Sequence, residues 1–213
     1  MQFSVYLFDF DGTLCDTRES LVPVFQAGFA SVGRPVSKEE AGRWMHLNLM
    51  QTLKESGVAE EQYQTVIDAT IAALDIPESI AMIRPFEDAV PLLLQLKQQG
   101  KKIGIVSNNA STHIRLVLDT LGIDIPFDCI VGSDMFQNGK PHPEPIEMAL
   151  SILNEKVGSD VVYVGDSLQD PECGINAGIE GSCLTAKTRT PLMMASASIL
   201  WMNYARFVRW NCG

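Results

Sequence analysis

Short apolar runs recur along the chain, and polar signatures follow closely after four of them. Each run is too short for a helix and is rich in β-branched or aromatic residues, which is typical of a buried strand. The runs are residues 3–8, 102–106, 127–131, 161–164 and 183–185. From the second run onward helix-like patterns separate them, and strands that alternate with helices pair in parallel. The sequence therefore predicts an α/β fold, with a doubly wound parallel sheet and helices on both of its faces.

One long stretch breaks this alternation. It contains only helix-like patterns, at residues 20–32, 37–56 and 60–74. Glycine and proline punctuate the gaps between these patterns. We expect residues 15–83 to form a small α-helical domain inserted after the first strand, and residues 1–14 and 84–213 to form the core domain. The insertion leaves the core near the carboxyl ends of the strands, where open α/β folds bind ligands, so we expect it to lie over the site as a lid.

The composition limits the partners of the protein. The chain has 213 residues and a formal net charge of −10. This charge argues against an extended surface for nucleic acid or for an anionic membrane, which would need a basic face. The five cysteines are scattered without C-x-x-C pairs, so we expect no disulfide framework or zinc site, and a reducing cytoplasm as the compartment. The amino terminus lacks the basic region of a signal peptide, and residues 191–208 are expected to form a core strand and a terminal helix.

Two aspartates end the first predicted strand, and Gly12 after them gives the chain the freedom to turn. Asp9 is the expected nucleophile, because a carboxylate can attack phosphorus and so divide hydrolysis into two easier steps. Asp11 is expected to protonate the leaving oxygen and later to deprotonate the attacking water. The alternative is a solvated turn, since loops often contain such pairs.

A second pair of acids, Asp166 and Asp170, follows the strand predicted at residues 161–164. A spacing of four residues brings two side chains to one face of a helical turn. Facing Asp9, the two carboxylates would form an oxygen-rich site suited to Mg²⁺, which would also reduce the repulsion between a carboxylate and a phosphate. The alternative is that Asp170 caps the next helix while Asp166 lies in a turn.

Two further signatures supply groups that can bind phosphate. Ser107 and Asn108 follow the second predicted strand, where a hydroxyl and successive backbone N–H groups can hold phosphate oxygens at a helix start. The alternative is that Ser107 or Asn109 only caps that helix. Lys140 is the strongest candidate for a cation that neutralises the phosphate, because nearby prolines such as Pro141 stiffen its loop. The alternative is a surface lysine.

The inserted segment offers residues that could select the substrate, although ordinary helix-surface positions are the favoured interpretation. These candidates are Arg18, Arg43, Trp44 and His46. Other apolar residues recur at helical spacing, and we expect them to form the core of the lid and not a ligand groove. They are Met45, Leu49, Met50 and Leu53.

Taken together, these residues closely resemble the haloacid dehalogenase-like hydrolase superfamily, in the branch with a helical cap after the first strand. The matches to its four motifs are, in order, Asp9 with Asp11, Ser107, Lys140, and Asp166 with Asp170. The resemblance covers nearly the whole chain. It implies a Rossmann-like core with an inserted α-helical cap.

The resemblance also implies roles for the acids. Asp9 and Asp166 would bind Mg²⁺ through their carboxylates, Asp11 would bind it through its main-chain carbonyl, and Asp170 would support the site. In the dehalogenases the acid two residues beyond the nucleophile is absent, so Asp11 implies phosphate chemistry. The chain looks like a phosphatase.

Within this branch the chain is similar to phosphoglycolate phosphatase and its relatives, through residues 9–14, 16–17 and 140–143. It departs from them in the cap, where residues 43–46 lack the expected glycine-containing turn, and at Asp88, where relatives often carry glycine. We therefore expect a small organic phosphomonoester, phosphoglycolate-like or a sugar phosphate, as the partner of a monomer or homodimer.

Three other functions fit parts of the same pattern. A phosphosugar mutase would use the same Asp9 and Asp11, and a non-catalytic binding module could share the fold. A phosphonate-cleaving enzyme would need a Schiff-base lysine in the cap, where Lys38 and Lys54 are more simply explained as surface residues. The apolar run at residues 198–210 would complete the core or leave a patch for self-association.

Overall fold

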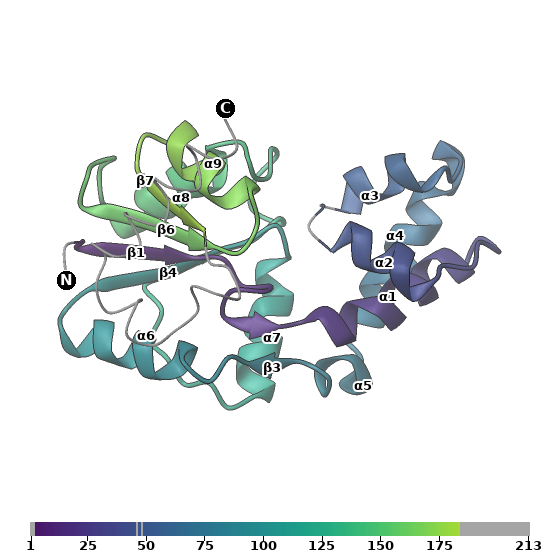
Figure 1. Cartoon of the computed structure of the whole chain (residues 1–213), viewed down its shortest axis with the longest axis horizontal. Helices are drawn as coiled ribbons and strands as arrows, with labels where there is room; N and C mark the ends of the chain where they lie inside the picture. Colours follow the sequence, from purple (N-terminus) through teal and green to yellow (C-terminus); the bar gives the residue numbers. More distant parts are fainter. Residues whose placement is uncertain (1–2, 46, 48, 184–213) are drawn as a thin grey trace.

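A five-stranded parallel sheet forms the centre of the protein, seen here in a computed structural model that describes residues 3–45, 47 and 49–183 (Figure 1). The strand order is β5-β4-β1-β6-β7. The strands are β1 (Val5–Phe8), β4 (Lys102–Val106), β5 (Cys129–Val131), β6 (Val161–Gly165) and β7 (Glu180–Cys183). The predicted α/β fold with a doubly wound parallel sheet is confirmed.

Helices cover both faces of this sheet. They are α6 (Ala89–Gln98), α7 (Ser111–Thr120), α8 (Glu144–Leu153) and α9 (Gln169–Asn176). Because side chains alternate along a strand, Tyr6 and Phe8 pack in the apolar cluster that includes α6 and α7, whereas Val5 and Leu7 pack in the cluster that includes α8 and α9. Figure 1 shows α6 and α7 on one side of the sheet and α8 and α9 on the other.

The last strand differs from its prediction, because it begins at Glu180 and not at residue 183. Its sequence carries no apolar run because α9 approaches β7 too closely for larger side chains. A Cβ atom on Gly181 would lie 2.5 Å from the Pro171 carbonyl oxygen, and one on Gly174 would lie 2.9 Å from the Gly181 Cα. The expectations for residues 184–185, 191–208 and 198–210 lie outside the described residues.

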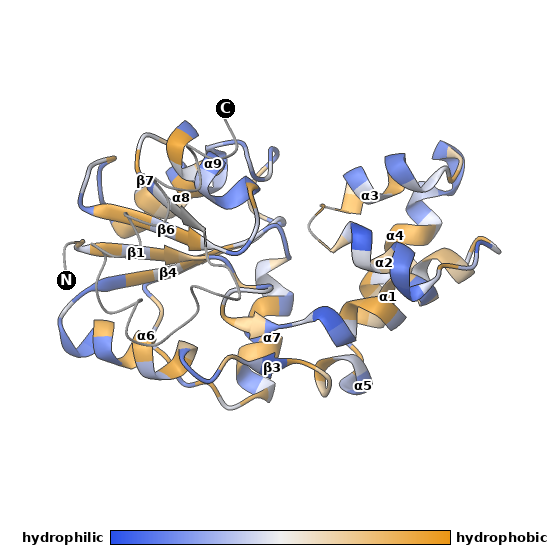
Figure 2. Cartoon of the chain, viewed as in Figure 1, coloured by the Kyte–Doolittle hydropathy of each residue, from blue (hydrophilic) through white to orange (hydrophobic). Residues whose placement is uncertain are grey.

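Between β1 and β4 the chain forms a group of helices that we call the cap, and we call the sheet with α6 to α9 the core (Figure 1). The cap helices are α1 (Arg18–Ala30), α2 (Lys38–Trp44), α3 (Leu49–Ser56), the 3-10 turn η1 (Glu60–Gln62), α4 (Tyr63–Leu74) and α5 (Pro77–Ile80). Helices α1 to α4 enclose an apolar cluster of their own, to which Phe25, Phe29, Leu53 and Val66 contribute buried side chains. The hydropathy colours of Figure 2 show this apolar character along α4.

The helix expected over residues 37–56 is in fact two helices, α2 and α3. Trp44 and Leu53 lie nine positions apart, so a straight helix would direct them to opposite faces. Both are buried in the single cap cluster, where the centroids of the Trp44 and Phe29 rings lie 5.0 Å apart. The chain therefore turns after Trp44, and the Leu47 N–H donates to the Trp44 carbonyl (2.9 Å).

Two short strands join the cap to the core. β2 (Cys15–Asp16) and β3 (Arg84–Pro85) run antiparallel, with Asp16 opposite Arg84. The chain thus enters and leaves the cap side by side, while the exact domain limits at residues 14/15 and 83/84 stay a prediction. In the part of the chain that the structure describes, no helix combines the length and apolar character needed to cross a membrane.

Candidate active site

Asp9 lies directly after β1, at the carboxyl edge of the sheet. Its N–H donates to the Val164 carbonyl of the neighbouring strand (2.9 Å), which continues the pairing of β1 with β6. The residue is only 6% exposed. Its Oδ1 accepts a hydrogen bond from the Phe10 N–H (2.8 Å) and lies 2.9 Å from Lys140 Nζ. Strand pairing and these contacts hold the carboxylate in one place.

Lys140 is held between two buried carboxylates. Its Nζ donates to Asp170 Oδ1 at 2.6 Å, in addition to its contact with Asp9. The other oxygen of Asp170 accepts from the N–H and the hydroxyl of Ser167 (2.9 and 2.8 Å). Gly165 makes room for this carboxylate, since a Cβ there would lie 2.1 Å from Asp170 Cγ. The ammonium group is therefore positioned by the fold and not by solvent.

Burial and charge act differently on these three groups. Burial raises the pKa of Asp9 to about 8, and the charges of Asp170 and Asp11 add to the rise while Lys140 opposes it. Burial alone would lower the pKa of Lys140, but Asp170 and Asp9 together raise it. Burial opposes ionisation of Asp170, yet Lys140 and Ser167 hold its pKa below the usual range. The Lys140–Asp170 pair thus stays charged, whereas Asp9 keeps its proton up to about pH 8 unless further positive charge is bound beside it.

Three carboxylates converge at this point. Asp9, Asp166 and Asp170 each offer an oxygen atom, and these oxygens all lie within 4.8 Å of one another. Gly12, with a φ of 74°, lets the first loop pass beside Asp166, because a Cβ there would lie 2.2 Å from Asp166 Oδ2. Asp166 precedes α9, so the two acids of the fourth signature do not share a helical turn, but they do meet. A set of carboxylate oxygens of this kind fits a hard divalent cation such as Mg²⁺.

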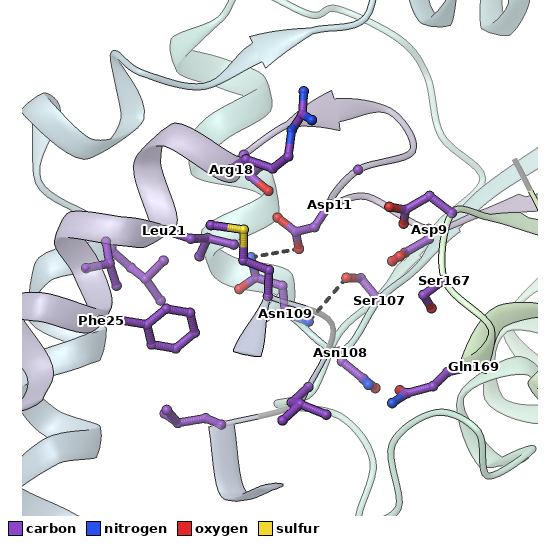
Figure 3. Close-up of a pocket in the computed structure, with 18 of the residues that line it drawn as sticks. Asp9, Asp11, Arg18, Leu21, Phe25, Ser107, Asn108, Asn109, Ser167 and Gln169 are labelled. Carbon is purple, nitrogen blue, oxygen red and sulfur yellow. Dashed lines mark hydrogen bonds between the residues drawn. The ribbon is translucent and has the colours of Figure 1, made fainter. Parts of the chain in front are cut away.

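Asn109 holds the carboxylate of Asp11, a role that the sequence did not reveal. Its Nδ2 donates to Asp11 Oδ2 at 3.2 Å, and its backbone N–H donates to Ser107 Oγ at 3.2 Å (Figure 3). The other oxygen of Asp11 is buried and has no hydrogen-bond partner among the described residues. Asn108 Oδ1 accepts from the Lys140 N–H (2.9 Å), so this side chain ties the lysine loop to the end of β4.

A cavity of about 590 Å³ opens beside these groups, between the core and the cap. Its core end is polar, and Figure 3 shows Asp9, Ser167 and Gln169 across the space from Leu21 and Phe25 of α1. The core residues that line it are Asp9, Asp11, Gly12, Phe86, Ser107, Asn108, Asn109, Lys140, Asp166, Ser167 and Gln169.

The structure places the cap residues proposed from the sequence in different environments. Arg18 lines the cavity, whereas Trp44 is buried in the cap cluster and Arg43 is exposed away from the cavity. His46 lies outside the described residues. Met45 and Leu49, expected in the lid core, both line the cavity, and Leu49 also packs against the cap cluster. Leu53 is buried in the cap cluster as expected, and Met50 is 48% exposed.

Comparison with known proteins places the chain in a family. The family profile described as haloacid dehalogenase-like hydrolase matches residues 6–182. The chain belongs to the haloacid dehalogenase-like hydrolases. A curated relative of this hydrolase, the pyrophosphatase PpaX of Listeria welshimeri, is 31% identical over 178 residues, which is 83% of this chain and 80% of the relative. The PpaX of Bacillus cereus is 28% identical over 186 residues, or 87% and 84% of the two chains.

Solved structures agree with this assignment. A haloacid dehalogenase-like hydrolase so named from Bacteroides fragilis superposes with a TM-score of 0.80 at 28% identity, over 91% of this chain and 92% of that one. A structure named for a phosphoglycolate phosphatase from Lactobacillus plantarum gives a TM-score of 0.75 at 20% identity over 84% of each chain, which shows the shared fold. The chain is a hydrolase of the phosphatase type.

Proposed function

We propose that this hydrolase is a Mg²⁺-dependent phosphatase that cleaves a small organic phosphomonoester through a phosphoaspartyl intermediate on Asp9. The observation that carries the proposal is the position of the Asp9 carboxylate. It lines the cavity, and its Oδ1 lies 2.9 Å from the buried Lys140 Nζ. A carboxylate fixed beside a fixed cation is suited to receive a phosphoryl group, because the cation stabilises the charge on the group in transfer.

The reaction proceeds in two steps. An Asp9 oxygen forms a bond to phosphorus while the ester P–O bond breaks, and Asp11 gives a proton to the departing alcohol. Asp11 then takes a proton from a water molecule, which attacks the phosphoaspartate and releases inorganic phosphate and free Asp9. The buried Asp11 Oδ1, which has no partner among the described residues, is available for both proton transfers, while Asn109 holds Oδ2.

The remaining groups hold the phosphate and the metal. We assign phosphate binding to Ser107, Asn108 and Lys140. Mg²⁺ would be held by the carboxylates of Asp9 and Asp166 and by the main-chain carbonyl of Asp11, with Asp170 in support.

The metal would neutralise negative charge shared by nucleophile and phosphate. The clustered carboxylates and the raised pKa of Asp9 support this assignment, since both indicate a site short of positive charge.

The test is phosphate release from para-nitrophenyl phosphate and small phosphomonoesters, with and without Mg²⁺. Replacing Asp9→Asn removes the nucleophile, and we expect kcat to fall by at least about 10⁴-fold. The control is Asp119→Asn, which makes the same change on the exposed surface of α7 and should leave kcat unchanged. Undiminished release by folded Asp9→Asn protein would refute the proposal.

The same experiment separates the alternatives. A phosphosugar mutase would need a bisphosphate primer and would release little phosphate, whereas the phosphatase releases it at a steady rate. A phosphonate-cleaving enzyme would need a Schiff-base lysine of the cap in the cavity, and neither Lys38 nor Lys54 lines it. A non-catalytic binding module would release no phosphate from any of these substrates.

We extend the proposal to the setting of the enzyme. It would act on a small phosphorylated metabolite in the cytoplasm, without nucleic acid or membrane, as a monomer or homodimer. The net charge of −10 supports this, as do the buried free thiols of Cys15, Cys129 and Cys173 in the described part of the chain.

A further inference from the structure

The cap end of the cavity is apolar. Six of its lining residues are large apolar side chains from α1, the α2–α3 region and α4: Leu21, Phe25, Met45, Leu47, Leu49 and Leu74. In Figure 3, Leu21 and Phe25 lie on the opposite side of the space from Ser167 and Gln169. A phosphate held beside Asp9 therefore directs its leaving group toward this apolar wall.

Arg18 and Thr70, two polar residues of the wall that the structure describes, already have partners. Among the described cap residues that line the cavity, Arg18 is the only charged one, and its Nε donates to Asp16 Oδ1 at 2.8 Å. Its side chain is 70% exposed. The Thr70 hydroxyl donates to the Val66 carbonyl of its own helix at 2.7 Å and is directed toward Gly28. Among the residues that the structure describes, a charged leaving group would find no dedicated counter-ion at this end of the cavity.

Within residues 3–45, 47 and 49–183, the core end offers no spare cation either. Lys140 is the only lysine or arginine among the described core residues that line the cavity, and it lies between Asp9 and Asp170. A carboxylate or a second phosphate against the cap wall would lose its water without gaining a partner, which is strongly unfavourable. Methylene or aromatic carbon would instead gain from burial.

We propose that the leaving group is an uncharged alcohol with an apolar aliphatic or aromatic body. This inference rests on the proposed phosphatase function and narrows its substrate class. It separates the chain from its named relatives, because pyrophosphate and phosphoglycolate would each direct a second anionic group into the cap wall.

The test compares substrates of matched reactivity. Benzyl phosphate and 2-phosphoglycolate are both phosphate esters of primary alcohols, so they differ mainly in the apolar or charged group that meets the cap. We expect kcat/KM for benzyl phosphate to exceed that for 2-phosphoglycolate, and that for inorganic pyrophosphate, by at least about tenfold. An equal or reversed ranking overturns the inference.

A charge placed in the wall should change this ranking. In Leu21→Lys we expect kcat/KM to fall about tenfold for benzyl phosphate and to rise for 2-phosphoglycolate. Ile71→Lys is the matched control, because Ile71 is a cap residue that is 51% exposed and does not line the cavity. Met45→Lys repeats the test from another element if Leu21→Lys fails to fold. Wall variants that leave the ranking unchanged while folded overturn the inference.

The outcomes also distinguish the inference from the function on which it rests. Turnover of para-nitrophenyl phosphate with a preference for 2-phosphoglycolate or pyrophosphate refutes the apolar leaving group and leaves the phosphatase standing. Absence of phosphate release from every substrate, para-nitrophenyl phosphate included, refutes both.

Discussion

The two ends of the cavity are built in different ways. At the core end, charged groups fix one another, as in the contacts of Lys140 Nζ with Asp170 (2.6 Å) and Asp9 (2.9 Å). At the cap end the side chains belong to a small apolar cluster of their own, in which shape matters more than hydrogen-bond geometry. The comparison teaches that a change at the core end should affect the chemistry, whereas a change at the cap end should alter which molecule is accepted.

The largest expected effect on stability comes from the buried ion pair. Asp170→Asn removes the carboxylate that, with Asp9, neutralises Lys140, and Asp170 is fully buried. Breaking such a pair is strongly destabilising, so we expect the free energy of unfolding to fall by about 3 kcal/mol. Urea denaturation of the native protein and the variant measures this change in the free energy of unfolding.

An exposed pair in the same domain is the control. Glu155 lies 2.7 Å from Lys102, and their side chains are 31% and 42% exposed. Glu155→Gln should lower the free energy of unfolding by less than about 1 kcal/mol. Equal losses in the two variants would contradict the view that Lys140 depends on its buried partner.

Two glycines sharpen the comparison between core and cap. Gly12 in the core and Gly33 in the cap have φ values of 74° and 73°, so an alanine at either should cost about 1–2 kcal/mol in backbone strain. Only at Gly12 would the new Cβ meet Asp166, since nothing lies within 4 Å at Gly33.

The two alanine variants should therefore differ in metal dependence. We expect Gly12→Ala to raise the Mg²⁺ concentration for half-maximal activity by at least about tenfold, because Asp166 is displaced. Gly33→Ala should leave it unchanged. The measurement is a titration of activity against Mg²⁺ concentration for both variants. Equal midpoints for Gly12→Ala and Gly33→Ala would count against Asp166 as a metal ligand.

The hydrogen bond from Asn109 to Asp11 should matter for turnover more than for binding. Asn109→Ala frees the Asp11 carboxylate to rotate, and we expect kcat to fall by about tenfold with KM nearly unchanged. Gln64→Ala removes a similar amide-to-carboxylate bond, to Asp68 on the exposed surface of α4, and should leave kcat unaltered. A rise in KM alone would contradict the positioning role.

A separate effect is expected on the pH dependence of stability without metal. Burial raises the pKa of Asp9 from 3.8 to about 8, so between these values the folded protein binds more protons than the unfolded chain. Stability should then fall as the pH rises through this range. In EDTA we expect the melting temperature to drop by on the order of 10 °C between about pH 5 and pH 8. Asp9→Asn should lack this slope, and an identical slope in both proteins would refute its origin in Asp9.

Much of the site was predictable because parallel strands end at one edge of a sheet. Asp9, Ser107 and Asp166 each follow a run that reads as a strand, so the sequence alone brings them together. Lys140 was predictable only as a cation near this edge. Its two buried carboxylate partners depend on packing that no local pattern encodes.

Other features had no local signal. Asn109 looked like a helix cap, and only the path of the first loop brings Asp11 within 3.2 Å of it. β7 carries glycine where α9 approaches, so the usual apolar run is missing. Met45 and Leu49 show the spacing of a helix core, but the break after Trp44 turns them to the cavity. In each case tertiary contact, and not local preference, decides the structure.

The antiparallel pairing of Asp16 with Arg84 has a consequence for how such enzymes diversify. Since the two ends of the cap segment lie side by side, its length and internal sequence can vary without moving any strand of the sheet. The paired strands β2 and β3 thus form a fixed junction at which helical segments of different length and sequence can be joined to the core. Related enzymes can therefore differ in the helical insert, and so in the substrate that they accept, while the catalytic residues of the core keep their positions.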